Sequence, residues 1–592
     1  MPADPDELLA KAERARRDGN ALATFDLARG AIAAGRTEAR FRYLQVLASA
    51  QMGDTHRAQS LYELHGLGEL TSDEDSLALR GRLFKDLALN SAAPEDRRRH
   101  FEEASEAYLR AYRVRHGYFP AINAATTAWA AGHRAEAEEF ARVILAHPEL
   151  SPPRDWYAAA TQAEALVLLG WGDEALAAIE TAMAAGAVGL GDRASACRQL
   201  AWLAPTTSLT ADQQRRLLAA LRPPPVITYT GHMFRPDPAV EAELTARIAA
   251  EIDSLGSTIA YGALASGADI LFAEEILRRG GELHVVLPFG DEDFIRASVA
   301  PGGREWIPRF HNCFARASGV TLATRMEYVG YDSQFAYGSQ LARGLSLLRA
   351  GQMATESVQL AVWDGLPARG GAGAGHDVGD WKSLGFETRI IDPGDMDRSM
   401  EWSDDIAPDL GVGRTTRAII FTDYKGYSRL PESAIPTFNR EVMGRIAAVL
   451  GRYGPAILSR NTWGDAFHGI IEDVASAAAI TLDIIDALKG VHVAGLGAAG
   501  AEGMRIGLHF GPVYEETDLV TGRPNFYGSE VTLAARIEPA AIPGEVYTTQ
   551  AFAAILAATA PDRFATRYLG KVELAKGYGV LPIYQLERRL AD

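Results

Sequence analysis

The chain has 592 residues and a net charge of −17 at pH 7, and 47% of its residues are hydrophobic. This length exceeds what one hydrophobic core supports, so we expect three or four domains, each with its own core. The negative charge argues against a surface that grips nucleic acid, and we expect no nucleic-acid partner.

The two cysteines, Cys197 and Cys313, lie far apart in the sequence. This number excludes a disulfide framework and a cysteine-rich zinc site, and it fits a reducing compartment. Residues 1–19 lack the apolar segment of a signal peptide, and the sequence has no run of 18 or more apolar residues. We therefore expect a cytoplasmic protein without a membrane partner.

Residues 1–222 show helical periodicity almost throughout, with frequent alanine and leucine and little proline. Gly53, Gly132 and Gly170 each close a helix, and an alanine follows five residues later in the next one. Small residues let paired helices approach closely, so the pattern predicts an all-α domain of stacked helical hairpins. This domain resembles the tetratricopeptide repeat, and residues 118–126 resemble the TRAFs-binding domain of signalling proteins. The resemblance implies a scaffold or a site for a protein partner.

In residues 223–393 the helical periodicity gives way to strands that alternate with helices. Three prolines at 223–225 end the helical pattern. Strands expected at 226–229, 258–261, 283–288 and 358–363 then alternate with helices, which predicts an α/β, Rossmann-like parallel sheet. A glycine-rich turn leads into a helix at 270–280, and free N–H groups there would suit a phosphate. The alternative is that its small residues only pack the helix onto the sheet.

The turn at 262–269, together with 362–365, resembles the SLOG group of Rossmann-like domains, many of which bind nucleotides or nucleotide-derived signals. The glycine-rich segment 368–380 is expected to be a loop, and 394–414 an acidic linker. The resemblance implies a nucleotide-derived ligand held by the following residues: Gly231, Gly262, Ser266, Gly267 and Asp269.

Residues 415–592 have the expected order strand, helix, strand, strand, helix, strand. The strands are expected at 418–423, 456–460, 464–470 and 504–511, and the helices at 433–452 and 472–489. This βαββαβ order predicts an α+β, ferredoxin-like domain with a mixed sheet.

Two aspartates of this domain stand out on chemical grounds. Asp423 ends an apolar strand, and Asp465 lies at a turn between two strands. A buried carboxylate needs a cation or a hydrogen-bond donor, because burying it unpaired is costly. Capping of the turn that follows Asp423 and metal binding both satisfy this requirement, and the residue types alone leave both open.

Several segments in this order resemble the motifs of class III nucleotidyl cyclases, which convert a nucleoside triphosphate to a 3′,5′-cyclic nucleotide and pyrophosphate. The resemblance implies two Mg²⁺ or Mn²⁺ ions per site. It also implies a homodimer, because in this family the aspartates come from one protomer and a helix from the other. The motifs are at 421–428, 463–467, 504–513, 527–536, 544–549 and 574–579.

The resemblance assigns a role to each matching residue. In the family, an arginine on the helix stabilises charge on the α-phosphoryl group, and an arginine and a lysine elsewhere grip the β- and γ-phosphates. Carried over, these roles give catalytic residues Arg536, Thr532 and Lys576, metal ligands Asp423, Asp465 and Tyr424, and substrate-binding residues Arg505, Lys425, Gly426, Ser428, Asn461 and Asn525.

Three of these positions depart from the adenylyl cyclase pattern. Thr532 replaces an asparagine, and Asn461 and Asn525 replace the lysine and the aspartate that read the base. Prevalence in the family favours ATP. The two asparagines also resemble the base-reading positions of bacterial anti-phage cyclases that use CTP or UTP, and GTP ranks lowest.

The leading hypothesis is an active cyclase that the helical and SLOG-like domains regulate. A second hypothesis is a catalytically silent module that binds nucleotide and signals by dimerising. A third hypothesis is that the two upstream domains act as a scaffold and sensor, which is the main function, and that the cyclase domain contributes only modest activity.

Overall fold

The computed structural model describes residues 5–186, 188–368, 370–402, 412–491 and 503–589. Two compact units emerge from the internal contacts: Met1–Pro223 with Gly351–Thr355, and Pro224–Ala350 with Glu356–Asp592. The second unit contains two separate sheets. The predicted fold class is confirmed: a helical region, a parallel sheet and a mixed sheet follow one another along the chain.

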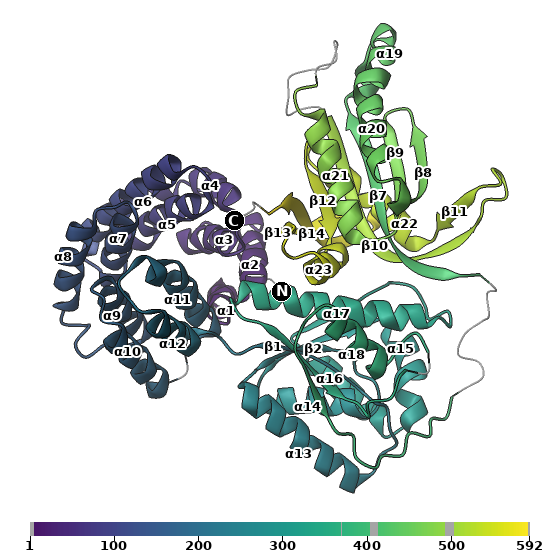
Figure 1. Cartoon of the computed structure of the whole chain (residues 1–592), viewed down its shortest axis with the longest axis horizontal. Coiled ribbons are helices and arrows are strands. Elements are labelled where there is room, and N and C mark those ends of the chain that lie inside the picture. Colours follow the sequence, from purple (N-terminus) through teal and green to yellow (C-terminus); the bar gives the residue numbers. More distant parts are fainter. Residues whose placement is uncertain (1–4, 187, 369, 403–411, 492–502, 590–592) are drawn as a thin grey trace. The chain divides into compact units, whose positions relative to one another are not determined.

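The N-terminal unit is an array of paired helices (Figure 1). Gly53, Gly132 and Gly170 have φ angles of 84°, 98° and 79°, in the left-handed region that favours glycine after a helix. The alanines five residues later, such as Ala58 and Ala137, are buried in the helix contacts. The helices are α1 (Pro5–Arg17), α2 (Ala21–Ala33), α3 (Ala39–Gln51), α4 (Thr55–Leu64), α5 (Glu74–Asn90), α6 (Pro94–Arg115), α7 (Tyr118–Ala130), α8 (Arg134–Leu145), α9 (Trp156–Leu168), α10 (Gly172–Ala185), α11 (Leu190–Leu203) and α12 (Ala211–Leu221).

The middle domain is built on a six-stranded parallel sheet with the order β4-β3-β2-β1-β5-β6. Figure 1 shows α13 and α14 on one side of this sheet and α17 and α18 on the other. Its elements are β1 (Val226–Gly231), α13 (Pro238–Leu255), β2 (Ile259–Gly262), α14 (Ala268–Arg278), β3 (Glu282–Leu287), α15 (Asp291–Phe294), α16 (Trp306–Arg316), β4 (Gly319–Leu322), α17 (Asp332–Gln352), β5 (Ser357–Val362), α18 (Ala374–Ser383) and β6 (Thr388–Ile391).

Helix α18 corrects one expectation, because it begins inside the glycine-rich segment that we expected to be a loop. Gly373 precedes its first turn with a φ of 101°, a conformation that glycine adopts freely. Val378 and Trp381 are buried, and contacts with β1 and β5 hold α18 on the sheet. Tertiary packing therefore stabilises a helix that its glycines disfavour locally.

The C-terminal domain has a mixed sheet with the order β13-β14-β12-β10-β7-β9-β8, and β11 pairs with β10. Helix α21 packs on β7 and β10. The elements are β7 (Arg414–Lys425), α19 (Ile435–Phe438), α20 (Gly444–Arg452), β8 (Ile457–Trp463), β9 (Ala466–Ile471), α21 (Val474–Leu488), β10 (Gly503–Thr517), β11 (Pro524–Tyr527), α22 (Ser529–Ile537), β12 (Val546–Thr549), α23 (Gln550–Thr559), β13 (Phe564–Leu574) and β14 (Gly579–Arg588).

Two predicted elements of this domain have different bounds in the structure. The helix expected at 433–452 is divided into α19, a π-helical turn at Asn439–Met443 and α20. Pro436 lies in the first turn of α19, where its missing N–H is tolerated. The strand expected to end at Gly511 continues to Thr517, because β7 and then β11 pair with it beyond Pro512.

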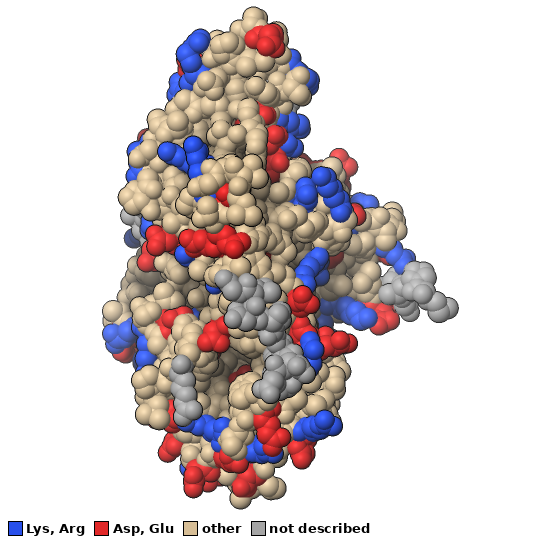
Figure 2. Space-filling view, turned by 90° about the vertical axis from the view of Figure 1, so that its right-hand side faces the viewer, with Lys and Arg blue, Asp and Glu red and all other residues tan. Residues whose placement is uncertain are grey.

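Acidic and basic side chains are interspersed over the face shown in Figure 2. Several ion pairs of the described helices join residues one helical turn apart, such as Lys11 with Glu7 and Arg98 with Glu102. Among the described residues, no helix is long and apolar enough to cross a membrane.

Candidate active site

Asp423 lies near the end of β7, directly opposite Arg505 on the neighbouring strand β10. An ion pair joins the Arg505 guanidinium to the Asp423 carboxylate. The Asp423 side chain is about one-third exposed, at 35%, so it faces a surface that a ligand can reach. The part of its strand just before it, residues 418–421, is apolar and includes the fully buried Ile419 and Ile420, so the sequence places a carboxylate next to the core.

Asp465 is brought to the same place by the tight turn between β8 and β9. Gly464 has a φ of +62°, and the next residue is Asp465. The Phe467 N–H donates to the Thr422 hydroxyl at 3.0 Å, which fastens the hairpin to the end of β7. The structure therefore brings Asp423 and Asp465 close enough for their charges to interact, and their role as metal ligands stays a prediction.

The electrostatics of Asp465 show that this place suits a cation. Burial raises the pKa of the Asp465 carboxyl, and the nearby charge of Asp423 raises it further. The Tyr424 N–H and Arg505 act in the opposite direction. Two carboxylates that repel each other near the end of an inner strand are stabilised by a bound cation.

Glu538 is a third carboxylate of this cluster that the sequence analysis missed. Its Oε1 lies 2.8 Å from Nε of Arg505 in an ion pair. Burial raises the pKa of Glu538 to about 7, Arg505 lowers it, and the charges of Asp423 and Asp465 raise it. Arg505 is therefore held between carboxylates, and its role in phosphate binding stays a prediction.

One sequence signal could have indicated Glu538. Gly507 lies inside β10, and a Cβ built on it would be 2.5 Å from the Glu538 backbone nitrogen. A glycine within a strand often marks a close approach by another backbone. Here that backbone is the segment after α22, which carries Glu538.

The last residues of β7 and the turn after it contain four further residues predicted to bind the metal or the triphosphate: Tyr424, Lys425, Gly426 and Ser428. The Tyr424 ring packs edge-on against Phe438, with centroids 5.0 Å apart. Gly426 has a φ of 108°, in the left-handed region, and Lys425 and Ser428 are exposed. The structure thus places this loop directly after Asp423, with its lysine and serine side chains in solvent.

Helix α22 carries Thr532 and Arg536 one turn apart. Thr532 is exposed and donates to the Gly528 carbonyl at 3.5 Å, and the Arg536 guanidinium lies 5.8 Å from the ring centre of Tyr578. Arg536 and Glu538 are two residues apart along a helical backbone and so do not share a face. Within one chain, Arg536 contacts the Tyr578 ring, whereas Glu538 pairs with Arg505.

Lys576 lies close in sequence to Tyr578, in the turn between β13 and β14. Its φ is +61°, one of few left-handed non-glycine residues among those described, and its side chain is exposed. The structure thus gives two groups of predicted residues: Asp423, Asp465 and Arg505 in one, and Arg536 near the turn that carries Lys576 in the other.

A buried polar network anchors the start of α22. His509 lies between Glu530, 2.7 Å from its Nε2, and Thr549, 2.8 Å from its Nδ1. His509 and Glu530 are 2% and 4% exposed. These contacts tie α22 to β10 and β12, and they restrict where the helix can present Thr532 and Arg536.

The two predicted base-reading residues lie on outer strands. Asn461 is exposed on β8, opposite His468 of β9. Asn525 is half-buried on β11, and its amide nitrogen donates to the Asp518 carboxylate at 3.2 Å. Their roles in substrate binding are not decided by these contacts.

The ligand residues predicted in the middle domain lie around the ends of β1 and β2. A Cβ at Gly231 would lie 2.4 Å from the Cβ of Ala268, and one at Gly262 would lie 2.4 Å from the Tyr229 ring. Packing alone therefore explains these two glycines. Ser266 is fully buried, Gly267 has a φ of +93°, and Asp269 is buried in the first turn of α14.

Residues 417–588 match the family model described as the adenylate and guanylate cyclase catalytic domain. The C-terminal domain belongs to this family. Residues 8–128 match the model of the Tetratricopeptide Repeats-Sensor. The cyclase and helical-repeat resemblances are thereby confirmed, while the SLOG resemblance of the middle domain stays a prediction.

Solved cyclase structures are similar to this cyclase domain at low identity. The guanylate cyclase domain of RhGC from Catenaria anguillulae, in complex with GTP, is 23% identical, with a TM-score of 0.26, and the match covers 30% of this chain and 100% of that one. The adenylyl cyclase CyaB from P. aeruginosa is 18% identical, with a TM-score of 0.26, covering 31% and 99%. A comparison with proteins of curated function gave no match.

The cyclase site fits hard divalent cations in its donor set. Its carboxylates are oxygen ligands, which Mg²⁺ and Mn²⁺ prefer. Among the described residues, no group of three or more His, Cys, Asp or Glu side chains could hold a metal ion alone. Asp423 and Asp465 would therefore share a cation with backbone and triphosphate oxygens, which is the usual way that Mg²⁺ is bound beside a nucleotide.

Proposed function

We propose that the cyclase domain converts a nucleoside triphosphate, with ATP as the favoured substrate, to a 3′,5′-cyclic nucleotide and pyrophosphate. The observation that carries this proposal is the convergence of Asp423, Asp465 and Arg505 at the end of β7, within a domain of the cyclase family. Burial and mutual repulsion favour a cation between the two aspartates, and that cation links them to a triphosphate.

The proposed reaction forms a bond between the ribose O3′ and the α-phosphorus and breaks the bond from the α-phosphorus to the bridging oxygen of pyrophosphate. The hydroxyl proton passes to solvent. Mg²⁺ or Mn²⁺ bound to Asp423 and Asp465 would lower the pKa of the hydroxyl and neutralise charge on the leaving pyrophosphate. Arg505, held by Asp423 and Glu538, contributes a fixed positive charge at the same edge.

We further propose that two copies of the chain complete each site. Arg536 contacts Tyr578 and not the cluster of Asp423, Arg505 and Glu538 in the contacts of the described residues, and an exposed Thr532 shares its helix. In a homodimer, α22 of the second copy would bring Arg536 to the α-phosphoryl group, with Lys576 near the outer phosphates.

The base preference rests on Asn525. Its amide nitrogen is engaged by Asp518, so its amide oxygen remains to accept a hydrogen bond. An exocyclic amine of adenine or cytosine donates such a bond, whereas the carbonyl groups of uracil or guanine at that edge do not. This observation supports ATP and keeps CTP as the second candidate.

The test is incubation of the purified chain with each of the four triphosphates and Mg²⁺ or Mn²⁺, followed by mass spectrometry of the product. We expect cyclic AMP as the main product. Asp562→Ala, at an exposed aspartate of the same domain, is the matched control for Asp465→Ala. Absence of a cyclic product from every triphosphate, in a preparation shown to be dimeric, would contradict the proposal and favour the silent nucleotide-binding module.

We also propose that the helical repeats and the middle domain regulate this activity, with the repeats binding a protein partner. The match of residues 8–128 to a sensor-type repeat supports this role. A chain that starts at residue 412 would test it, because regulation predicts a turnover rate that differs from that of the full chain under the same conditions.

A further inference from the structure

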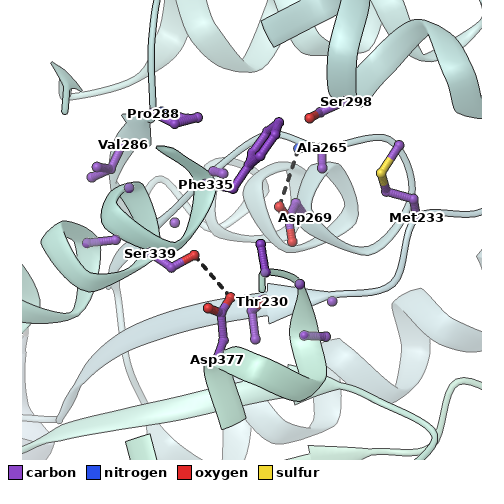
Figure 3. A pocket seen from close by; sticks show the side chains of 18 of the residues that line it. Thr230, Met233, Ala265, Asp269, Val286, Pro288, Ser298, Phe335, Ser339 and Asp377 are labelled. Carbon is purple, nitrogen blue, oxygen red and sulfur yellow. Dashed lines mark hydrogen bonds between the residues drawn. The ribbon is translucent and has the colours of Figure 1, made fainter. Parts of the chain in front are cut away.

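A cavity of about 580 Å³ opens in the middle domain at the carboxyl ends of the parallel strands (Figure 3). Its volume lies within the range of small-molecule sites. Strand order reverses between β1 and β5, since β2 to β4 continue on one side and β6 on the other. Ligands of open α/β sheets bind at such a switch point. Nothing in the proposed cyclase chemistry uses this cavity.

Two buried carboxylates face the cavity from different helices. Asp269, in the first turn of α14, is 7% exposed, and Asp377, on α18, is 5% exposed. Oδ2 of Asp269 accepts from the Ala265 N–H at 3.3 Å, while Oδ2 of Asp377 accepts from the hydroxyls of Thr230 at 2.8 Å and Ser339 at 3.1 Å. Figure 3 shows both carboxylates directed toward the space between the helices.

The second oxygen of each carboxylate is not satisfied. Oδ1 of Asp269 and Oδ1 of Asp377 have no hydrogen-bond partner among the described residues. His376 Nδ1 lies 4.0 Å from Oδ1 of Asp377, beyond hydrogen-bond distance, and the nearby Asp377 and Asp380 raise the pKa of His376. Buried acceptors are nearly always paired, so the protein leaves part of the hydrogen-bonding capacity of these two cavity-lining carboxylates unused.

The charges around the cavity leave it negative. Arg343 lines it, but its guanidinium pairs with Asp380 at 3.1 Å and donates to the Asp377 carbonyl. Burial lowers the pKa of His232, which favours the neutral ring. Asp332 adds a third carboxylate, which accepts from the Gly371 N–H at 2.8 Å.

The charge of Asp377 also affects the pKa of Asp269. Burial raises the pKa of Asp269 to about 7, and the charge of Asp377 adds to the increase. Like charges in a buried cavity are stabilised by a cation between them, or else one of them takes up a proton. A positively charged group in the cavity would offset the charge of both carboxylates.

The other walls also favour a cationic ligand. Phe294, Phe335 and Tyr328 line the cavity, and the last two rings meet edge-to-face with centroids 5.3 Å apart. Aromatic faces attract ammonium and guanidinium groups. Apolar aromatic walls beside paired carboxylates are therefore complementary to a positively charged group on an apolar body.

A phosphate fits this place less well. The loop before α14 does free backbone N–H groups, but Ala265 already donates to Asp269 and Ala268 donates to the His232 carbonyl. Both helices that begin at the cavity, α14 and α18, also carry a buried carboxylate near their first turn. An anion would lie against two carboxylates, which is electrostatically unfavourable.

We propose that this cavity binds a small organic cation, with a protonated amine or amidine group between Asp269 and Asp377 and an apolar body against Phe335 and Tyr328. The ligand site is independent of the cyclase reaction. The binding proposal can therefore be tested whether or not the C-terminal domain cyclises triphosphates.

The test is isothermal titration calorimetry of the full chain, without metal or triphosphate, with tyramine and agmatine as probes. The neutral comparison is 4-(2-hydroxyethyl)phenol, which has the ring and chain of tyramine with a hydroxyl in place of the amine. Adenosine monophosphate and inorganic phosphate represent the anionic alternative. We expect one of the amines to bind at least about ten-fold more tightly than the neutral and anionic compounds, since a buried charge-assisted pair discriminates by this much.

Asp269→Asn and Asp377→Asn preserve side-chain size and should each weaken amine binding about ten-fold or more. Asp253→Asn is the matched control, because Asp253 is an exposed aspartate of the same domain that pairs with Arg279. Ser298→Leu fills the cavity without removing a carboxylate and should also block binding. Thermal unfolding of each variant checks that it remains folded.

Three results would overturn the proposal: no measurable binding of either amine, amine binding that survives both aspartate substitutions or Ser298→Leu, and tighter binding of phosphate or the monophosphate than of the amines.

Discussion

Gly507 and Glu538 are in direct contact: a Cβ on Gly507 would lie 2.5 Å from the Glu538 backbone nitrogen and 3.0 Å from its Cα. Because the two backbones lie this close, the Glu538 side chain reaches Arg505, which also pairs with Asp423. The geometry of the cation site thus depends on a residue that has no side chain.

Gly507→Ala should therefore displace Glu538 and lower both activity and stability. We expect a loss of about 1–3 kcal/mol in the free energy of unfolding, as for overpacked sites generally. Urea denaturation and cyclase assays of the purified variant measure the two effects. Gly451→Ala, at a glycine with open space around it in the same domain, is the control. Equal stability and equal activity of the two variants would contradict the prediction, because they would show that the segment carrying Glu538 can shift without affecting either.

Asp465→Ala should abolish cyclisation while leaving the fold intact. Removing a metal ligand forfeits several kcal/mol of transition-state stabilisation, which corresponds to about a thousand-fold in turnover. Because burial and Asp423 raise the pKa of Asp465, its loss should not destabilise the unliganded protein. Product formation and thermal unfolding are measured side by side with Asp562→Ala. Full turnover by Asp465→Ala would refute the metal assignment.

The composite site predicts complementation between inactive chains. Arg536→Ala and Asp465→Ala should each be inactive alone. A heterodimer of the two retains one site in which the aspartates and the helix are both intact. An equimolar mixture that exchanges subunits should regain about a quarter of wild-type activity, because about half of the dimers are mixed and each has one working site. Failure to regain activity, with mixed dimers shown by native mass spectrometry, would exclude a site shared between protomers.

Asn525→Ala should reduce the preference for adenine, whose exocyclic amine donates to the Asn525 amide oxygen in the proposed site. Loss of one hydrogen bond to the base typically costs about 1–3 kcal/mol, or about ten-fold or more in kcat/KM. The expected loss is larger for ATP than for GTP, so the ratio of the two kcat/KM values falls. Asn439→Ala, at an exposed asparagine of the same domain, provides the comparison. An unchanged ratio would place base recognition elsewhere.

The raised pKa of Asp269 predicts a pH-dependent stability for the middle domain. Its folded pKa is about 7 against an unfolded value of 3.8, so the folded state holds more protons between these values. Stability therefore falls as pH rises from about 4 to about 7, by up to about 4 kcal/mol for this group. Asp269→Asn should remove that dependence and be the more stable form above pH 7. Hydrogen exchange of α14 amides at pH 5.5 and 7.5 measures it, and identical pH dependence in both proteins would contradict the prediction.

Much of the architecture could be predicted from residue patterns alone. Buried strands such as β1 and β5 are short segments rich in apolar and β-branched residues, and the helical array shows its glycine and alanine spacing along the chain. Asp423 and Asp465 were recognisable because a carboxylate beside an apolar strand requires a partner. These features depend on local periodicity and on residue chemistry, which the sequence displays directly.

Other features depended on which segments meet in space. Helix α18 forms from a glycine-rich segment because Val378 and Trp381 are buried, and it brings Asp377 to the same cavity as Asp269, more than a hundred residues earlier. Glu538 meets Arg505 only because Gly507 admits its backbone. The sequence by itself determined the elements and the chemistry of single residues. Only the tertiary structure decided which carboxylates share a cavity, because burial and charge interactions depend on distances between residues far apart in the chain.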